Sequence, residues 1–120
     1  MNISMISLGV ADQARSLRFY RDVLGFVAPP GADGGEVVVL RLPGEGPMLV
    51  LNVPAGRAHP GPLAGAVEIV LHVPHVEEAH AALVQKGCEF LRAPREIYPG
   101  NWGATLCDPD GHMLTIVGAR

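Results

Sequence analysis

The sequence predicts an α+β fold in which tandem βαβββ modules form a curved eight-stranded mixed sheet around a cleft. The stretch MISLGVAD (5–12) matches EIVLHVPH (68–75), and GPMLVL (46–51) matches GHMLTI (111–116). Each half also reads as a strand, a helix and then three strands. A half of about 60 residues with a single helix would bury little apolar surface alone, so we expect the two sheets to combine.

The first half begins with the strand-like residues 5–10, which lead to Asp12, a residue type that caps helix N-termini. An apolar stripe after Asp12 predicts a helix that Gly25 ends. The strands EVVVLRL and MLVLNV follow, and the turn PGEGP joins them into a hairpin.

The second half repeats this order with EIVLHV as a strand and VEEAHAALVQK as a helix that stops at Gly87. CEFLRA is expected as a strand, followed by a loop to Trp102. ATLC and HMLTIV then form a closing hairpin around DPDG, where proline, aspartate and glycine each favour a turn.

Length and composition set the domain organisation and the class of partner. We expect one domain at 1–120, with repeat units at about 1–53 and 67–120 and a linker at 54–66. The net charge of −3, without a basic run, disfavours nucleic-acid binding. No stretch reaches the ~18 apolar residues of a membrane span. A cytoplasmic protein is therefore expected, with Cys88 and Cys107 as buried reduced thiols.

Strand alternation indicates which residues face a cleft. The apolar set of each first strand should pack under the helix, and the alternate set should face the other way. Val50 and Thr115 take equivalent positions in the matching strands GPMLVL and GHMLTI. The residues expected on the cleft face are Met5, Ser7, Val50, Glu68, His72 and Thr115.

Two motifs carry a resemblance to a known family. The pattern D-x-x-x-S-x-x-F-Y-x-x-x-L-G-F at 12–26 resembles the glyoxalase/bleomycin-resistance/dioxygenase group, the vicinal oxygen chelate superfamily. DPDGHMLTI (108–116) is similar to that family's D-P-D-G-x-x-[IL]-E-[IL] ending. The resemblance covers almost the whole chain, and it implies eight strands curled around a cleft, commonly in a homodimer.

The resemblance also implies four metal-ligand positions. In metal-using members, His, Glu or Gln stands at the start of each unit's first strand and in each unit's last strand. These positions are Met5, Val50, Glu68 and Thr115 here, and only Glu68 suits a hard divalent cation. We therefore expect no metal and no cofactor, which counts against glyoxalase, dioxygenase and thiol-transferase chemistry.

Other candidate residues leave alternatives open. Glu68 and His72 lie four residues apart on one strand, so their Cα atoms should be roughly 13 Å apart, too far to share an ion. Glu68 could act as a general base in a dry cleft. His75 and His80 are expected in surface or capping roles. Trp102 is either packed over the sheet edge or a stacking platform for a planar ligand.

The function expected first is metal-free binding of a small apolar or aromatic molecule in the sheet cleft of a homodimer, with Glu68 or His72 orienting the ligand. Sequestration of an antibiotic or toxin, as in the bleomycin-resistance branch, is its most concrete form. The alternative is a lyase, isomerase or dioxygenase with a non-standard metal site or with Glu68 as base. A third hypothesis is a structural domain without a ligand.

Overall fold

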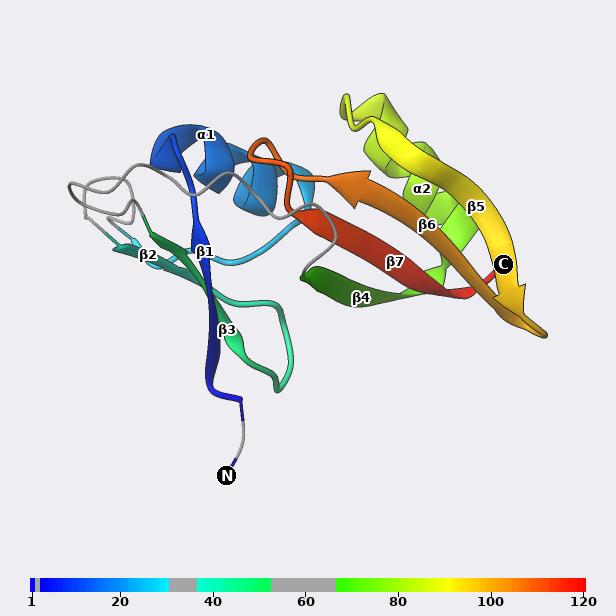
Figure 1. The fold of residues 1–120 in the computed structure, drawn as a ribbon, viewed down its shortest axis with the longest axis horizontal. Helices are drawn as coiled ribbons and strands as arrows, with labels where there is room; N and C mark the ends of the chain where they lie inside the picture. The colour runs from blue at the N-terminus through cyan, green and yellow to red at the C-terminus, as the bar shows by residue number, and fades with distance from the viewer. Residues whose placement is uncertain (2, 31–36, 53–66) are drawn as a thin grey trace. The chain divides into compact units, whose positions relative to one another are not determined.

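A computed structural model describes residues 1, 3–30, 37–52 and 67–120 of the chain. The chain divides into two compact units, Met1–Gly61 and Pro62–Arg120. The boundary falls within the predicted linker at 54–66, all of which lies outside the described residues. The described residues form one mixed sheet of three strands and one of four, so the α+β class is confirmed (Figure 1).

The first unit contains a three-stranded sheet in the order β1-β3-β2. β1 runs parallel to β3, and β2 runs antiparallel to it. Its elements are β1 (Met5–Gly9), α1 (Gln13–Leu17), the π-helical segment η1 (Arg18–Val23), β2 (Val37–Leu40) and β3 (Met48–Asn52).

The helix of the first unit begins and ends where the sequence predicts. The side chain of Asp12 accepts a hydrogen bond from the backbone N–H of Arg15 at 3.0 Å, which caps α1. The chain leaves the helix at Gly25, whose φ of +84° is a conformation that favours glycine. Apolar periodicity does not predict the change to π-helix at Arg18, since the same side of the helix stays apolar.

The second unit contains a four-stranded sheet in the order β4-β7-β6-β5. β4 and β7 are parallel, and the other neighbours are antiparallel. The single helix of this unit, α2, lies against one face of the sheet (Figure 1). The elements are β4 (Glu68–His75), α2 (Val76–Gln85), β5 (Phe90–Tyr98), β6 (Asn101–Cys107) and β7 (Met113–Ala119).

One expectation for the second unit is wrong. The loop predicted from residue 94 to Trp102 is instead a hairpin, since β5 continues to Tyr98 and Trp102 lies within β6. Gly100, with φ of +80°, forms the turn. The β5–β6 register shifts between Phe90 and Arg92 and again between Arg92 and Arg95. Such bulges break the two-residue alternation by which a strand is recognised in a sequence.

The described residues form seven strands rather than the eight expected. In the second unit, β5 is the first strand after the helix and pairs with β6. In the first unit, an isolated antiparallel bridge between Val27 and Arg41 stands at the corresponding place in the chain. A single bridge satisfies few backbone groups, so the described residues between η1 and β2 form much less sheet than β5 does.

The same strand register occurs in each of the two sheets. Ser7 pairs with Val50 in the first unit, and Val70 pairs with Thr115 in the second. Met5 likewise pairs with Met48, as Glu68 pairs with Met113. Val50 and Thr115 therefore hold the same position in the two sheets.

The DPDG turn is formed as its sequence indicates. Asp108 is buried, and its Oδ1 accepts hydrogen bonds from the backbone N–H groups of Asp110 at 2.9 Å and His112 at 2.8 Å. Gly111 has a φ of +89°. These contacts lead the chain directly into β7. None of the helices in the described ranges is long and apolar enough to cross a membrane.

Candidate functional site

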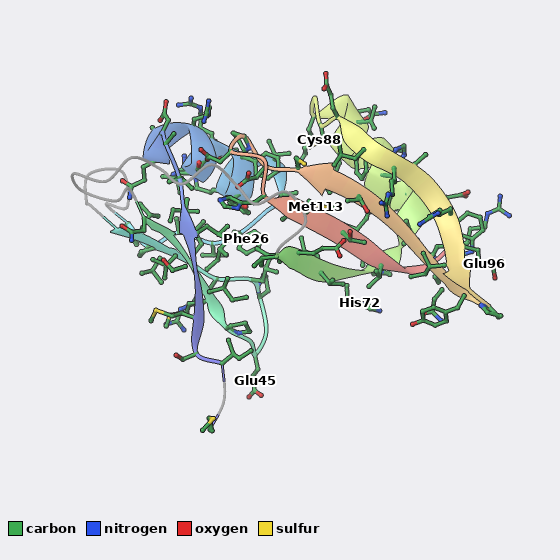
Figure 2. All side chains as sticks on the ribbon, viewed as in Figure 1. Phe26, Glu45, His72, Cys88, Glu96 and Met113 are labelled. Carbon is green, nitrogen blue, oxygen red and sulfur yellow. The ribbon has the colours of Figure 1, made fainter. Side chains whose placement is uncertain are left out.

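The candidate site lies on the face of the four-stranded sheet opposite α2, which we call the distal face. The α2 side is identified by its core, in which Val76 of the helix packs with Ala104 and Ile116. Strand alternation and register then assign the opposite side chains. The distal residues are Glu68, Val70, His72, Arg92, Arg95, Ile97, Gly103, Thr105, Cys107, Met113, Thr115 and Val117. Figure 2 draws the side chains on these strands and labels His72 on β4 and Met113 at the start of β7.

A chain of hydrogen bonds crosses three strands of the distal face. The Thr115 hydroxyl on β7 donates to Oε1 of Glu68 on β4. The hydroxyls of Thr105 and Thr115 lie 2.9 Å apart. A threonine hydroxyl has one hydrogen, and that of Thr115 goes to the carboxylate, so Thr105 is the donor to Thr115. The chain fixes the Glu68 carboxylate at the end of a polar row.

Strand pairing explains why these three side chains meet. Thr105 and Thr115 are direct partners in the antiparallel β6–β7 ladder, where opposed side chains lie close together. Glu68 is two residues before Val70, the parallel partner of Thr115, so it reaches Thr115 diagonally. Thr105 is 5 % exposed, Thr115 is partly buried and Glu68 is exposed. The row therefore runs from the buried part of the sheet outward.

Apolar side chains lie beside this polar row. Val70 is 58 % exposed and stands between Glu68 and His72 on the same face of β4. Val117 on β7 pairs with His72 and is partly buried, as is Met113. The distal face therefore carries an exposed apolar surface beside a row of hydrogen-bonded polar groups.

The structure brings three of the predicted site residues onto one face. Glu68 and Thr115 are in direct contact, and His72 lies on the same side of β4. Met5, Ser7 and Val50 share one face of the three-stranded sheet, where Ser7 and Val50 are register partners. Met5 and Ser7 are exposed, whereas Val50 is buried.

Trp102 lies on the α2 side of the sheet, away from Glu68 and Thr115. Its ring packs against the core of Val76, Ala104 and Ile116. The guanidinium of Arg120 stands 4.8 Å from the ring centroid, and its Nε lies 3.1 Å from Oε1 of Glu77 on α2. Of the two interpretations of this ring, packing is the one that its contacts support.

Sequence reasoning missed Thr105, Arg92 and Arg95. Thr105 could have been found, because in ATLC it alternates with two apolar residues that face the helix. Arg92 carries no such signal, because the register shift after Phe90 puts it on the face opposite to the one that alternation gives. Arg95 lies beyond the strand CEFLRA that the sequence predicts.

The four family positions do not form a set of donors that fits a hard divalent cation. Met5 offers a soft thioether and Val50 has no donor atom. The Thr115 hydroxyl is a hydrogen-bond donor to Glu68, the one carboxylate of the four. Across the described part of the chain, no three His, Cys, Asp or Glu side chains gather in a way that could hold a metal ion.

The two cysteines are free thiols rather than a disulfide. Burial raises the pKa of Cys107, which lies on the distal face, and the neighbouring charge of Asp108 raises it further. Burial also raises the pKa of Cys88, although Lys86 opposes the shift. Both thiols are partly buried rather than fully buried as expected, and both are weak nucleophiles near neutral pH.

Comparisons with known proteins agree with this fold. The family model for the Glyoxalase/Bleomycin resistance protein/Dioxygenase superfamily matches residues 2–116. A member of that superfamily from Sphaerobacter thermophilus DSM 20745 is 25 % identical, with a TM-score of 0.78 over 98 % of this chain and 97 % of that one. TnmS3, an antibiotic binding protein from Streptomyces sp. CB03234, is 22 % identical, with a TM-score of 0.79 over 100 % and 97 %.

A glyoxalase/bleomycin resistance protein from the same Streptomyces is 23 % identical, with a TM-score of 0.73 over 96 % of this chain and 98 % of that one. A search of curated proteins finds no match.

Proposed function

The chain belongs to the Glyoxalase/Bleomycin resistance protein/Dioxygenase superfamily, and from this premise we propose that it binds a small apolar or aromatic molecule without a metal. The distal face is the proposed binding surface, and sequestration of an antibiotic or toxin is the proposed outcome. The observation that carries the proposal is the hydrogen-bonded row of Thr105, Thr115 and Glu68 beside exposed Val70.

This arrangement suits binding because it combines shape-tolerant apolar contact with a fixed polar group. A flat ligand covering Val70 and Val117 would gain about 25 cal/mol for each Å² of apolar surface removed from water. The Glu68 carboxylate, held by Thr115, would accept a hydrogen bond from the ligand and set its orientation. His72 supplies a second polar group on the same strand.

The comparison with TnmS3 supports the proposal, because that protein is described as antibiotic binding and shares the fold over nearly the whole of both chains. We further propose a cytoplasmic homodimer. Two free thiols fit a reducing compartment. The edge strand β5 exposes Leu91 and Tyr98, apolar side chains of the kind that a partner surface covers.

The competing function is an enzyme of the same superfamily that uses Glu68 as a base. The contact with Thr115 favours this enzymatic function, because a general base must be held in a fixed orientation toward the proton that it removes. Glu68→Gln separates the two: it should abolish turnover by an enzyme, whereas a binding protein should lose only part of its affinity.

The proposal is tested by titrating the full chain with a panel of planar aromatic compounds in a calorimeter. Val70→Glu should abolish binding, because it places a charge in the middle of the apolar surface. Val84→Glu is the matched control, since Val84 lies on α2 and is 47 % exposed. Equal losses in both variants would contradict a site on the distal face. Tightly held stoichiometric Zn, Ni, Mn or Fe in protein purified without chelator would overturn the metal-free mechanism.

A further inference from the structure

Two arginines stand on the distal face at the edge of the sheet. Arg92 pairs with Thr105 and Arg95 pairs with Gly103 across the β5–β6 ladder. Three residues of β5 thus span two of β6, and this bulge turns both arginines to the side of Thr105. Both are exposed, and neither forms an ion pair within the described ranges.

The sheet surface beside Arg95 has no side chain at Gly103 and is bordered by apolar residues. Gly103 leaves β6 without a side chain between Arg95 and Val117. Ile97 borders this position, since a Cβ on Gly103 would lie 3.6 Å from its Cγ2 atom. A ring could therefore lie close to the strand here, with its edge at the guanidinium groups.

The arginines and Glu68 occupy opposite edges of the distal face. β5 and β4 are the outer strands of the four, so three strand spacings of about 4.8 Å separate them by roughly 14 Å. An anion bound at β5 would not meet Glu68, and the two threonines and Val117 would lie between them.

We propose that the ligand of the distal face is an aromatic carboxylate, whose anionic group is held by Arg92 and Arg95. This inference rests on the proposed function and names the class of molecule that the same surface takes. Guanidinium groups present paired N–H donors that match the two oxygens of a carboxylate. The chain has a net charge of −3, so two adjacent unpaired arginines provide a local charge complementary to an anion.

The test compares naphthoate with its neutral amide, naphthamide, by calorimetric titration of the full chain at low salt. Naphthoate should bind about tenfold more tightly, because the two compounds differ mainly in charge. The Arg92→Gln/Arg95→Gln double variant should lose this difference and keep its affinity for naphthamide. Arg18→Gln, a change at an exposed arginine of η1, should leave the preference intact.

The outcomes separate the two proposals. Equal affinity for naphthoate and naphthamide would overturn the carboxylate assignment and leave the proposed function standing. A preference that survives in the double variant would overturn the role of Arg92 and Arg95. Failure of both compounds to bind would count against both proposals. Thermal unfolding of the double variant is the control for folding. An unchanged unfolding curve shows that any loss of binding comes from the missing arginines and not from unfolding of the chain.

Discussion

The hydroxyl of Thr115 donates a hydrogen bond to the carboxylate of Glu68, joining β7 to the edge strand β4. Thr115 is one of the four metal-ligand positions that the family resemblance implies, and its hydroxyl instead donates to the neighbouring carboxylate. The same register position in the first unit is Val50, which cannot form such a bond. The contact is therefore a specific feature of the second unit.

Thr115→Val should reduce the free energy of unfolding by about 1 kcal/mol, since it removes the acceptor of the buried Thr105 hydroxyl together with the donor to Glu68. Urea unfolding measures this loss. Thr105→Val/Thr115→Val should cost less than the sum of the two single changes, because both bonds share one row. Strict additivity would show that the hydroxyls act independently.

Gly118→Ala should destabilise the second unit by about 1–3 kcal/mol, because the added methyl group would overlap the carbonyl oxygen of Val73 and lie 3.1 Å from its carbonyl carbon. Thermal or urea unfolding would record the change. Gly103→Ala is the matched control on the neighbouring strand, where the nearest contacts are an ordinary 3.6 Å. Similar losses at both positions would mean that strand glycine content, rather than this close approach, sets the cost.

Trp102→Phe should lower stability by about 1 kcal/mol and leave ligand affinity within about twofold, because the ring packs with the α2 core and Arg120. Calorimetry with the bound aromatic compound and urea unfolding give the two values. A variant that loses ligand binding but keeps its stability would contradict the packing role and show that Trp102 contacts the ligand.

Both cysteines should react slowly with iodoacetamide at pH 8, since burial raises each thiol pKa above the ordinary value of 9.0. The reaction needs the thiolate, so its rate should rise as the pH passes above 9 and should be higher in unfolded protein at every pH below that. Cys107→Ser leaves Cys88 as the single reporter. Rapid modification of the folded protein at pH 7 would contradict the assigned direction of the shifts.

Local sequence signals predicted most of the fold. Asp12 and Gly25 mark the two ends of the first helix. The matching strand sequences also predicted that Val50 and Thr115 hold equivalent positions in the two sheets. These signals succeed because caps, positive φ angles and two-residue alternation depend on neighbouring residues alone.

The site was predicted only in part, because its remaining members depend on register. The bulge between Phe90 and Arg92 places Arg92 on the distal face, and the hairpin at Gly100 places Trp102 in a strand. A bulge has no fixed sequence pattern, so alternation counted from Phe90 assigns the wrong side to Arg92. The second bulge restores the phase, and Arg95 lies on the side that alternation gives.

The register that recurs in the two sheets separates the backbone from the chemistry it carries. Ser7 lies beside Val50 in one sheet, and Val70 lies beside Thr115 in the other. The same backbone position therefore holds a hydrocarbon side chain in the first unit and a hydroxyl in the second. The polar chemistry of this position can change while the strand pairing around it stays the same.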